Sequence, residues 1–191
     1  MGRGDKVLVE AAGQSRGKIV VVGGPGRNAG KTTLVCALIR ALRERQWVAA
    51  KITADDHGQP APLWEETRQS GKGTGRFLAA GAERAFLLTS NRDAMPMAEF
   101  WEAAGADANV IFESNRIAEE LQPDLCLAVI GAGEECKPSF APFLRRADAL
   151  LVSREASSPP PLAAGQRLFR GEPLEPLSDE LLAWARSVLR F

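Results

Sequence analysis

The chain has 191 residues, of which 45% are hydrophobic and 25% charged, and such values predict one globular domain with a sizeable core. Its 24 basic and 24 acidic residues cancel, so it lacks the basic excess that is typical of nucleic-acid-binding domains. No apolar run approaches the roughly 20 residues of a membrane span, and the N-terminus has no signal-peptide pattern. Its three widely spaced cysteines predict neither a disulfide framework nor a zinc site. We therefore expect a cytoplasmic protein with no nucleic-acid partner and no membrane partner.

The expected elements alternate between strands and helices along the chain. Runs of apolar and β-branched residues predict strands, at residues 6–10, 18–23, 47–53, 85–89, 109–113, 125–130 and 149–152. Apolar residues at helical spacing predict helices, at residues 32–45, 76–82, 97–104, 115–122 and 140–146. This alternation predicts an α/β fold of three layers, a mostly parallel sheet with helices on both faces. Ligands of such sheets bind beyond the carboxyl ends of the strands.

Two segments fit neither pattern. Residues 54–75 are polar and long for a connection, so we expect a mobile functional loop there. Residues 155–177 are rich in proline and are expected to form a surface excursion. Ser178 then begins a final helix over residues 178–191, because its hydroxyl can accept a hydrogen bond from an amide of the first turn. Residues 1–191 are accordingly expected to form a single domain.

The strongest motif is the glycine-rich run GGPGRNAGKTT at residues 23–33, between a predicted strand and a predicted helix. Glycines let backbone N–H groups approach a phosphate closely, and a helix N-terminus adds partial positive charge. Lys31 can reach the β- and γ-phosphates, and the hydroxyl of Thr32 can hold Mg²⁺. The alternative is a glycine-rich turn that binds no ligand. The residues expected to bind the nucleotide in this run are Gly24, Gly26, Arg27, Asn28, Ala29, Gly30, Lys31, Thr32 and Thr33.

On these residues the chain resembles P-loop NTPases of the signal-recognition, MinD and BioD class. Its loop is one residue longer than the common form and, from Gly24 to Thr32, resembles that of dethiobiotin synthetase. The remainder of residues 18–153 is similar to the molybdopterin-guanine dinucleotide biosynthesis protein B family. The resemblance implies the P-loop NTPase fold, a bound Mg²⁺ ion and GTP or ATP as the nucleotide. Gly26 stands where MinD-like relatives carry a lysine that crosses between subunits, which speaks against a dimer of that kind and leaves another homodimer open.

Two charged residues end predicted strands next to the loop. Glu113 ends the strand at 109–113 and is the candidate carboxylate for Mg²⁺ or its waters, and the similar families also end this strand with glutamate. Its alternative role is to cap the following helix together with Ser114 and Asn115. Lys51 ends the strand at 47–53, and the resemblance implies that it faces the phosphates. The alternative is a lysine that extends from the strand end into solvent.

Residues 55–57, which are Asp55, Asp56 and His57, follow that second strand. Asp56 is a candidate for reaching the metal through a water molecule. His57 is the remainder of a segment that is histidine-rich in the molybdopterin family, although a lone loop histidine is usually solvated.

The segment around Gly73 departs from the similar families. They carry a metal-associated aspartate at the position of Gly73, whereas Lys72, Thr74 and Arg76 match their pattern. Either Glu65, Glu66 or Asp56 replaces that carboxylate, or the protein binds nucleotide and hydrolyses it poorly. Lys31, Lys51, Lys72 and Arg76 are expected to converge on one anion site.

Ser153 and Arg154 follow the strand at 149–152, where the base of the nucleotide is expected to lie. They replace the aspartate motif of many guanine-specific P-loop proteins, so GTP is favoured by the resemblance alone and ATP stays open. We expect a Mg²⁺-dependent nucleoside triphosphate hydrolase that uses Lys31, Lys51 and Glu113 in catalysis and assists a partner protein in molybdopterin-type cofactor biosynthesis. The alternatives are an ATP-dependent ligase of the dethiobiotin synthetase type and a nucleotide-sensing module with little turnover.

Overall fold

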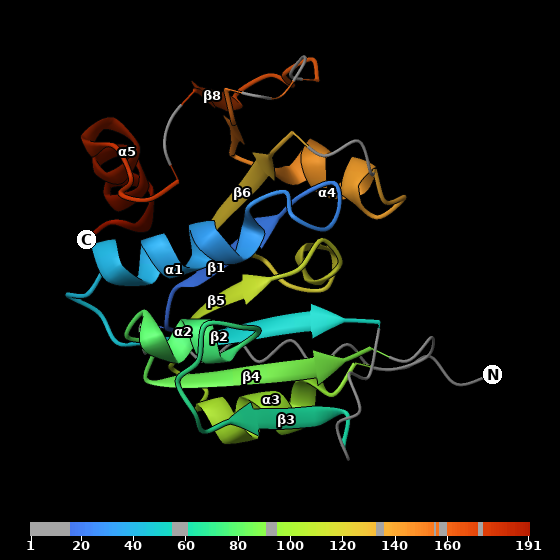
Figure 1. The fold of residues 1–191 in the computed structure, drawn as a ribbon, viewed down its shortest axis with the longest axis vertical. Coiled ribbons are helices and arrows are strands. Elements are labelled where there is room, and N and C mark those ends of the chain that lie inside the picture. Colours follow the sequence, from blue (N-terminus) through green and yellow to red (C-terminus); the bar gives the residue numbers. More distant parts are fainter. Residues whose placement is uncertain are drawn as a thin grey trace.

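The computed structural model describes residues 16–54, 61–90, 95–132, 136–154, 156, 160–171 and 174–191. The strand expected at residues 6–10 lies outside this part of the chain, as do Asp55, Asp56 and His57. Within the described residues the strands form one twisted sheet with helices on both faces (Figure 1).

The sheet has the strand order β3-β4-β2-β5-β1-β6-β7-β8. All neighbouring strands are parallel except β3 and β4, which are antiparallel. The strands are β1 (Ile19–Gly23), β2 (Trp47–Thr53), β3 (Leu63–Glu66), β4 (Arg84–Thr89), β5 (Asn109–Glu113), β6 (Leu125–Ile130), β7 (Ala149–Val152) and β8 (Arg167–Arg170). Every residue of the central strand β1 is buried, as expected for an apolar, β-branched strand that is covered on both faces.

The core is divided by the sheet into two hydrophobic clusters. Alternate side chains of a strand point to opposite faces, and Val20 and Val22 accordingly join one cluster while Ile19 and Val21 join the other. The first cluster is completed by α1, α2 and α5, and the second by α3, α4 and η1. The helices are α1 (Lys31–Ala41), α2 (Gly75–Ala79), α3 (Met97–Ala104), α4 (Phe140–Arg146) and α5 (Asp179–Leu189), and η1 (Ile117–Glu119) is a 3₁₀ turn. The predicted three-layer α/β fold is confirmed, and none of the described helices has the length and apolar character to cross a membrane.

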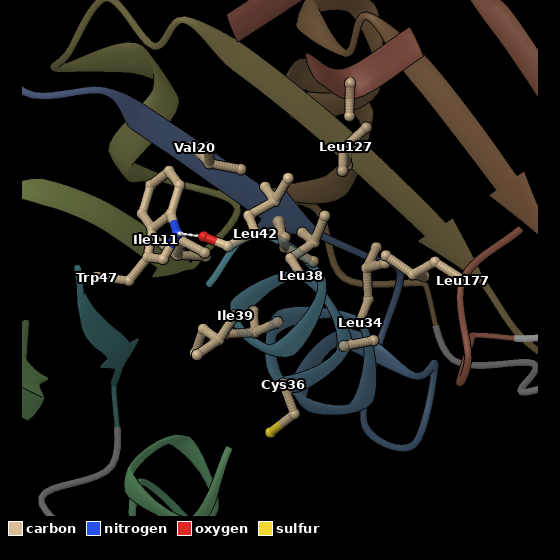
Figure 2. Packing of buried hydrophobic residues seen from close by; sticks show 14 of the residues in the cluster. Val20, Leu34, Cys36, Leu38, Ile39, Leu42, Trp47, Ile111, Leu127 and Leu177 are labelled. Carbon is tan, nitrogen blue, oxygen red and sulfur yellow. Dashed lines mark hydrogen bonds between the residues drawn. The ribbon is translucent and has the colours of Figure 1, made fainter. Parts of the chain in front are cut away.

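Helix α1 packs along β1 and orients the loop that precedes it. Figure 2 shows Leu34, Leu38 and Leu42 on the side of the helix that faces the sheet, and all three are fully buried. The helix ends at Ala41 rather than at residue 45 as predicted. The carbonyl of Leu42 accepts hydrogen bonds from the Arg45 amide at 3.1 Å and from the Trp47 indole at 2.9 Å. This turn lets β2 begin at once, with Trp47 buried in the core.

Two further helix predictions were wrong because a conformational or tertiary signal competed with the local pattern. Helix α2 ends at Ala79 instead of residue 82, since Gly81 takes a positive φ of 104° that an α-helix excludes. The helix predicted over residues 115–122 is only the turn η1, which Ser114 caps by accepting hydrogen bonds from the amides of Arg116 and Ile117 at 3.1 and 3.3 Å.

The segments predicted to be a loop and a surface excursion each contain an edge strand. Strand β3 lies within 54–75 and pairs with β4, while Leu63 packs against the second cluster. Strand β8 lies within 155–177 and pairs with β7, where it buries Phe169. The final helix begins as predicted, because the hydroxyl of Ser178 accepts a hydrogen bond from the Leu181 amide at 3.3 Å.

Candidate nucleotide-binding site

The glycine-rich loop lies between the end of β1 and the start of α1, at the carboxyl edge of the sheet (Figure 1). Gly30, the residue before α1, has a φ of 99°, and Asn28 also adopts the left-handed region with a φ of 60°. A Cβ atom on Gly24 would lie 2.7 Å from the carbonyl oxygen of Val129, so a larger residue would not fit there. The loop thus depends on glycine both for its turn and for its close approach to β6.

Asn115 clamps the start of this loop. Its Oδ1 atom accepts a hydrogen bond from the Gly24 amide at 2.9 Å, and its Nδ2 atom donates to the Gly24 carbonyl at 3.0 Å. The same Nδ2 atom donates to the hydroxyl of Ser139 at 3.3 Å. Because Gly24 offers one donor and one acceptor, a side-chain amide is suited to pair with both. Asn115 is expected from the sequence only as a helix cap, so this role is not predicted.

Lys31 opens α1 and folds back over the loop, where its ammonium group donates a hydrogen bond to the Gly26 carbonyl. The amides of the first helical turn have no partners within the helix, and they carry the positive end of the helix dipole. Lys31, the loop amides and the first turn of α1 therefore present several donors to one point, as an anion-binding site requires.

Thr32, Glu113 and Lys51 meet beside the loop. The hydroxyl of Thr32 donates to Oε2 of Glu113 at 2.7 Å, and Nζ of Lys51 lies 3.1 Å from Oε1. Strands β2 and β5 are parallel with Lys51 directly opposite Glu113, which explains why the two side chains meet. The Glu113 side chain is only 5% exposed, and both of its carboxylate oxygens have a polar partner, as a buried carboxylate requires. Ser114 caps η1, whereas Glu113 points to the loop.

A pocket of about 960 Å³ covers the loop and the carboxyl ends of β1, β2, β4 and β5. One carboxylate, that of Glu113, lines its described part. The cationic side chains that line it are Arg27, Lys31, Lys51, Arg76, Arg116 and Lys137. The chain as a whole is neutral, but the described part of this pocket is strongly basic. This favours a polyanionic ligand.

Of the cationic residues around Gly73, one lines the pocket and one does not. The guanidinium of Arg76 lines it and donates to the Thr33 hydroxyl at 3.4 Å. Lys72 is exposed and does not line the pocket, so its predicted convergence with the other cations is not observed. Gly73 has a φ of 55°, and a Cβ atom there would meet no atom of the described residues within 4 Å.

The two glutamates that were candidates to replace an aspartate at Gly73 have other partners. Glu65 pairs with Arg84 through Oε1 and Oε2 at 2.6 Å each, and these hydrogen bonds lower the pKa of Glu65 despite its partial burial. Glu66 accepts a hydrogen bond from the Arg68 amide at 3.0 Å. Neither lines the pocket. The third candidate, Asp56, lies outside the described residues.

The predicted base-binding residues follow β7, apart from the pocket. Nε of Arg154 donates to the Gly171 carbonyl at 3.0 Å. The hydroxyl oxygen of Ser153 is buried and finds no hydrogen-bond partner within the described part of the chain. Neither residue lines the pocket, and their contact with a base stays a prediction.

The chain is similar to a known protein family and to solved structures. A family model described as molybdopterin guanine dinucleotide synthesis protein B matches residues 19–117, about half of the chain. No curated protein sequence matches. The fold is similar to that of LpxK from Aquifex aeolicus, solved in complex with ATP, with a TM-score of 0.53 and 16% identity over 81% of this chain and 53% of LpxK. The signal recognition particle receptor FtsY from Elizabethkingia anophelis gives a TM-score of 0.44 and 14% identity over 87% of this chain and 63% of FtsY. The chain therefore spans about half the length of LpxK and less than two thirds of FtsY.

Proposed function

Because the chain belongs to the molybdopterin guanine dinucleotide synthesis protein B family, we propose that it binds a Mg²⁺-bound nucleoside triphosphate and assists molybdopterin-type cofactor biosynthesis. The observation that carries the proposal is the meeting of Thr32, Glu113 and Lys51 beside the phosphate loop. The three side chains come from α1, β5 and β2, so only the folded sheet assembles them. We further propose that the protein hydrolyses the nucleotide and that it acts with a partner protein of that biosynthesis.

The loop supplies the binding energy for the phosphates. Its amides and the first turn of α1 would bind the α- and β-phosphate oxygens. Lys31, whose ammonium now donates to the Gly26 carbonyl, would turn to the β- and γ-phosphates. The clamp of Asn115 on Gly24 keeps the loop in this shape before a nucleotide arrives, which lowers the entropy cost of binding.

The donor set beside the loop fits Mg²⁺. Thr32 and Glu113 offer a hydroxyl and a carboxylate oxygen, and Mg²⁺ prefers oxygen ligands. No group of three or more His, Cys, Asp or Glu side chains suited to a metal occurs among the described residues. This agrees with Mg²⁺, which is usually bound by one or two carboxylates together with phosphate and water. Bound Mg²⁺ would neutralise charge on the phosphate oxygens.

Two lysines would support phosphoryl transfer. Lys31 and Lys51 both line the pocket, and cations placed at the transferring phosphate stabilise its charge in the transition state. Lys51 lies 3.1 Å from Glu113 and is well placed to exchange this contact for a γ-phosphate oxygen. Water would be the acceptor in the hydrolase that we propose.

A nucleotide-sensing module with little turnover is the second candidate. Glu113 is the one carboxylate that lines the described part of the pocket, and its oxygens already contact Thr32 and Lys51. With Gly73 in place of an aspartate, the described residues offer no further acid to orient a water molecule. This favours tight binding with slow hydrolysis.

The experiment is a titration with ATP and with GTP, each with and without Mg²⁺, followed by measurement of phosphate release. Mg²⁺-dependent binding with release would support the hydrolase, and tight binding with negligible release would favour the sensing module. Release that requires an added small carboxylic acid would identify the ligase. Failure of both nucleotides to bind would contradict the proposed function as a whole.

A further inference from the structure

The pocket extends beyond the phosphate loop along the carboxyl ends of β5, β2 and β4. The loop follows β1, whereas Ser90, which also lines the pocket, follows β4. Strands β1 and β4 are three places apart in the sheet, which corresponds to about 14 Å at the usual spacing of neighbouring strands. A phosphate held by the loop amides over β1 therefore leaves the β4 end of the pocket for another group.

Arg116 crosses to this end of the pocket. It follows β5, yet its guanidinium donates to the Ser90 hydroxyl at 3.0 Å, so the side chain spans the carboxyl end of the intervening strand β2. Ser90 is 6% exposed, and its amide donates to the Thr53 carbonyl at 2.8 Å. The backbone of Arg116 is also fixed, because its amide donates to the Ser114 hydroxyl at 3.1 Å. A well-anchored guanidinium is thereby exposed to the pocket.

The charges that line the described pocket are unbalanced. Apart from Arg27 and Lys31, which have interactions of their own, the described pocket is lined by four cations, Lys51, Arg76, Arg116 and Lys137, against the single carboxylate of Glu113, which already contacts Lys51 at 3.1 Å. Across the part of the chain that the structure describes, Ser90 is the side chain that contacts the Arg116 guanidinium, and no carboxylate pairs with it. A nucleoside triphosphate brings Mg²⁺ with it, so it would neutralise only part of the positive excess.

We propose that Arg116 and Ser90 form a second anion subsite, which binds the phosphate group of a small second substrate while the nucleotide occupies the loop. The proposal rests on the proposed function, since the loop must hold the nucleotide for the subsite to be a second one. A planar guanidinium binds a phosphate through two parallel hydrogen bonds. The bond to Ser90 occupies one nitrogen of Arg116 and holds the side chain in place. The positive excess favours a dianionic phosphate over a carboxylate.

The test is a calorimetric titration of inorganic phosphate into protein that is saturated with Mg²⁺ and a non-hydrolysable ATP or GTP analogue. We expect saturable binding by the wild type and binding weaker by about tenfold or more in Arg116→Ala, because charge-assisted hydrogen bonds are lost. Arg116→Lys is expected to be intermediate, since an ammonium group lacks the planar fork. Arg145→Ala is the matched control, because Arg145 is an exposed arginine of α4 outside the pocket.

Equal phosphate binding by the wild type and Arg116→Ala would overturn the subsite, as would absence of phosphate binding by the nucleotide-loaded wild type. Acetate that binds as tightly as phosphate would overturn the assignment to a phosphate group.

A second titration tests the subsite independently of the proposed function. In it, inorganic phosphate is titrated without nucleotide into Lys31→Ala and into Lys31→Ala/Arg116→Ala. The first is expected to bind about tenfold more tightly than the second, and equal binding by both would again overturn the subsite. This difference does not depend on nucleotide binding.

Discussion

Asn115 pairs with both backbone polar groups of Gly24, accepting from its amide at 2.9 Å and donating to its carbonyl at 3.0 Å. The two residues are 91 positions apart in the sequence, so the clamp joins the end of β5 to the loop after β1. Since Gly24 lies at the start of the loop, the clamp determines where the loop leaves the sheet. The side chain of Asn115 therefore orders a segment that would otherwise lose conformational entropy when a phosphate binds.

Asn115→Ala is expected to weaken nucleotide binding about tenfold, because loss of two hydrogen bonds of about 0.5–1.5 kcal/mol each leaves the loop less ordered. The control is Asn115→Asp, which keeps the acceptor for the Gly24 amide, loses the donor for its carbonyl and adds a negative charge. We expect Asn115→Asp to bind nucleotide more weakly still. Calorimetric titration of the three proteins with the preferred nucleotide measures both effects, and unchanged affinity in both variants would show that the clamp does not order the loop.

Lys31→Ala is expected to lose measurable nucleotide binding while it keeps the fold. Lys31 is half-buried and lines the pocket, where its ammonium group contacts the Gly26 carbonyl, so its removal widens the pocket and leaves no closed cavity in the core. A cation beside the β- and γ-phosphates contributes strongly to affinity. Equilibrium binding together with a thermal melt separates affinity from folding, and Arg145→Ala again serves as the control. Wild-type affinity in Lys31→Ala would refute the assignment of the phosphate loop.

The order of elements was predictable where the local pattern and the tertiary environment agree. Strand β1 is an uninterrupted β-branched run, and such a run has few uses outside a sheet that is covered on both faces. The edge strands β3 and β8 were missed because they are short and partly exposed. Strand β8 has an arginine at each end and buries Phe169, so its strand character comes from pairing with β7 rather than from its own sequence.

The contacts among the candidate site residues were predictable where they follow from the spacing of residues in the sequence. Lys31 and Thr32 belong to a motif whose residues act together in one turn, and Glu113 meets Lys51 because parallel strands end at the same edge. Asn115 could not be recognised in this way, since its partner is fixed only by the fold. A polar residue two positions after a strand-ending carboxylate is the signal that could have drawn attention to it.

The ion pair between Glu65 and Arg84 predicts a pH-dependent contribution to stability. Hydrogen bonds from Arg84 lower the pKa of Glu65 in the folded protein, so the contribution is present above the ordinary pKa of a glutamate and is lost as the pH falls through the lowered value. Both side chains are more than a third exposed, which limits the contribution to less than about 1 kcal/mol. Urea unfolding should show Glu65→Gln less stable than the wild type at neutral pH, and the difference should disappear in acid. If the two proteins differed in stability by the same amount at all pH values, the difference would not come from the ionised pair of Glu65 and Arg84.

Substitutions of Lys51 and of Glu113 are expected to have strongly non-additive effects on the free energy of unfolding. Glu113 has a side chain that is 5% exposed, and Lys51, at 27%, supplies its opposing charge. Lys51→Met would leave a buried carboxylate with Thr32 as its partner, and we expect a loss of about 1–3 kcal/mol in the free energy of unfolding. Glu113→Gln keeps an acceptor for Thr32 and removes the charge, so Lys51→Met/Glu113→Gln should regain most of that loss. Urea unfolding of the four proteins gives the coupling energy.

The same four proteins separate stability from function. Glu113→Gln is expected to lose the Mg²⁺ dependence of nucleotide binding, because a neutral amide is a weak ligand for Mg²⁺. The double variant should therefore be stable and still fail to respond to Mg²⁺ in a nucleotide titration. Additive changes in the free energy of unfolding would show that the pair is not coupled, and Mg²⁺-dependent binding in Glu113→Gln would remove Glu113 from the metal site.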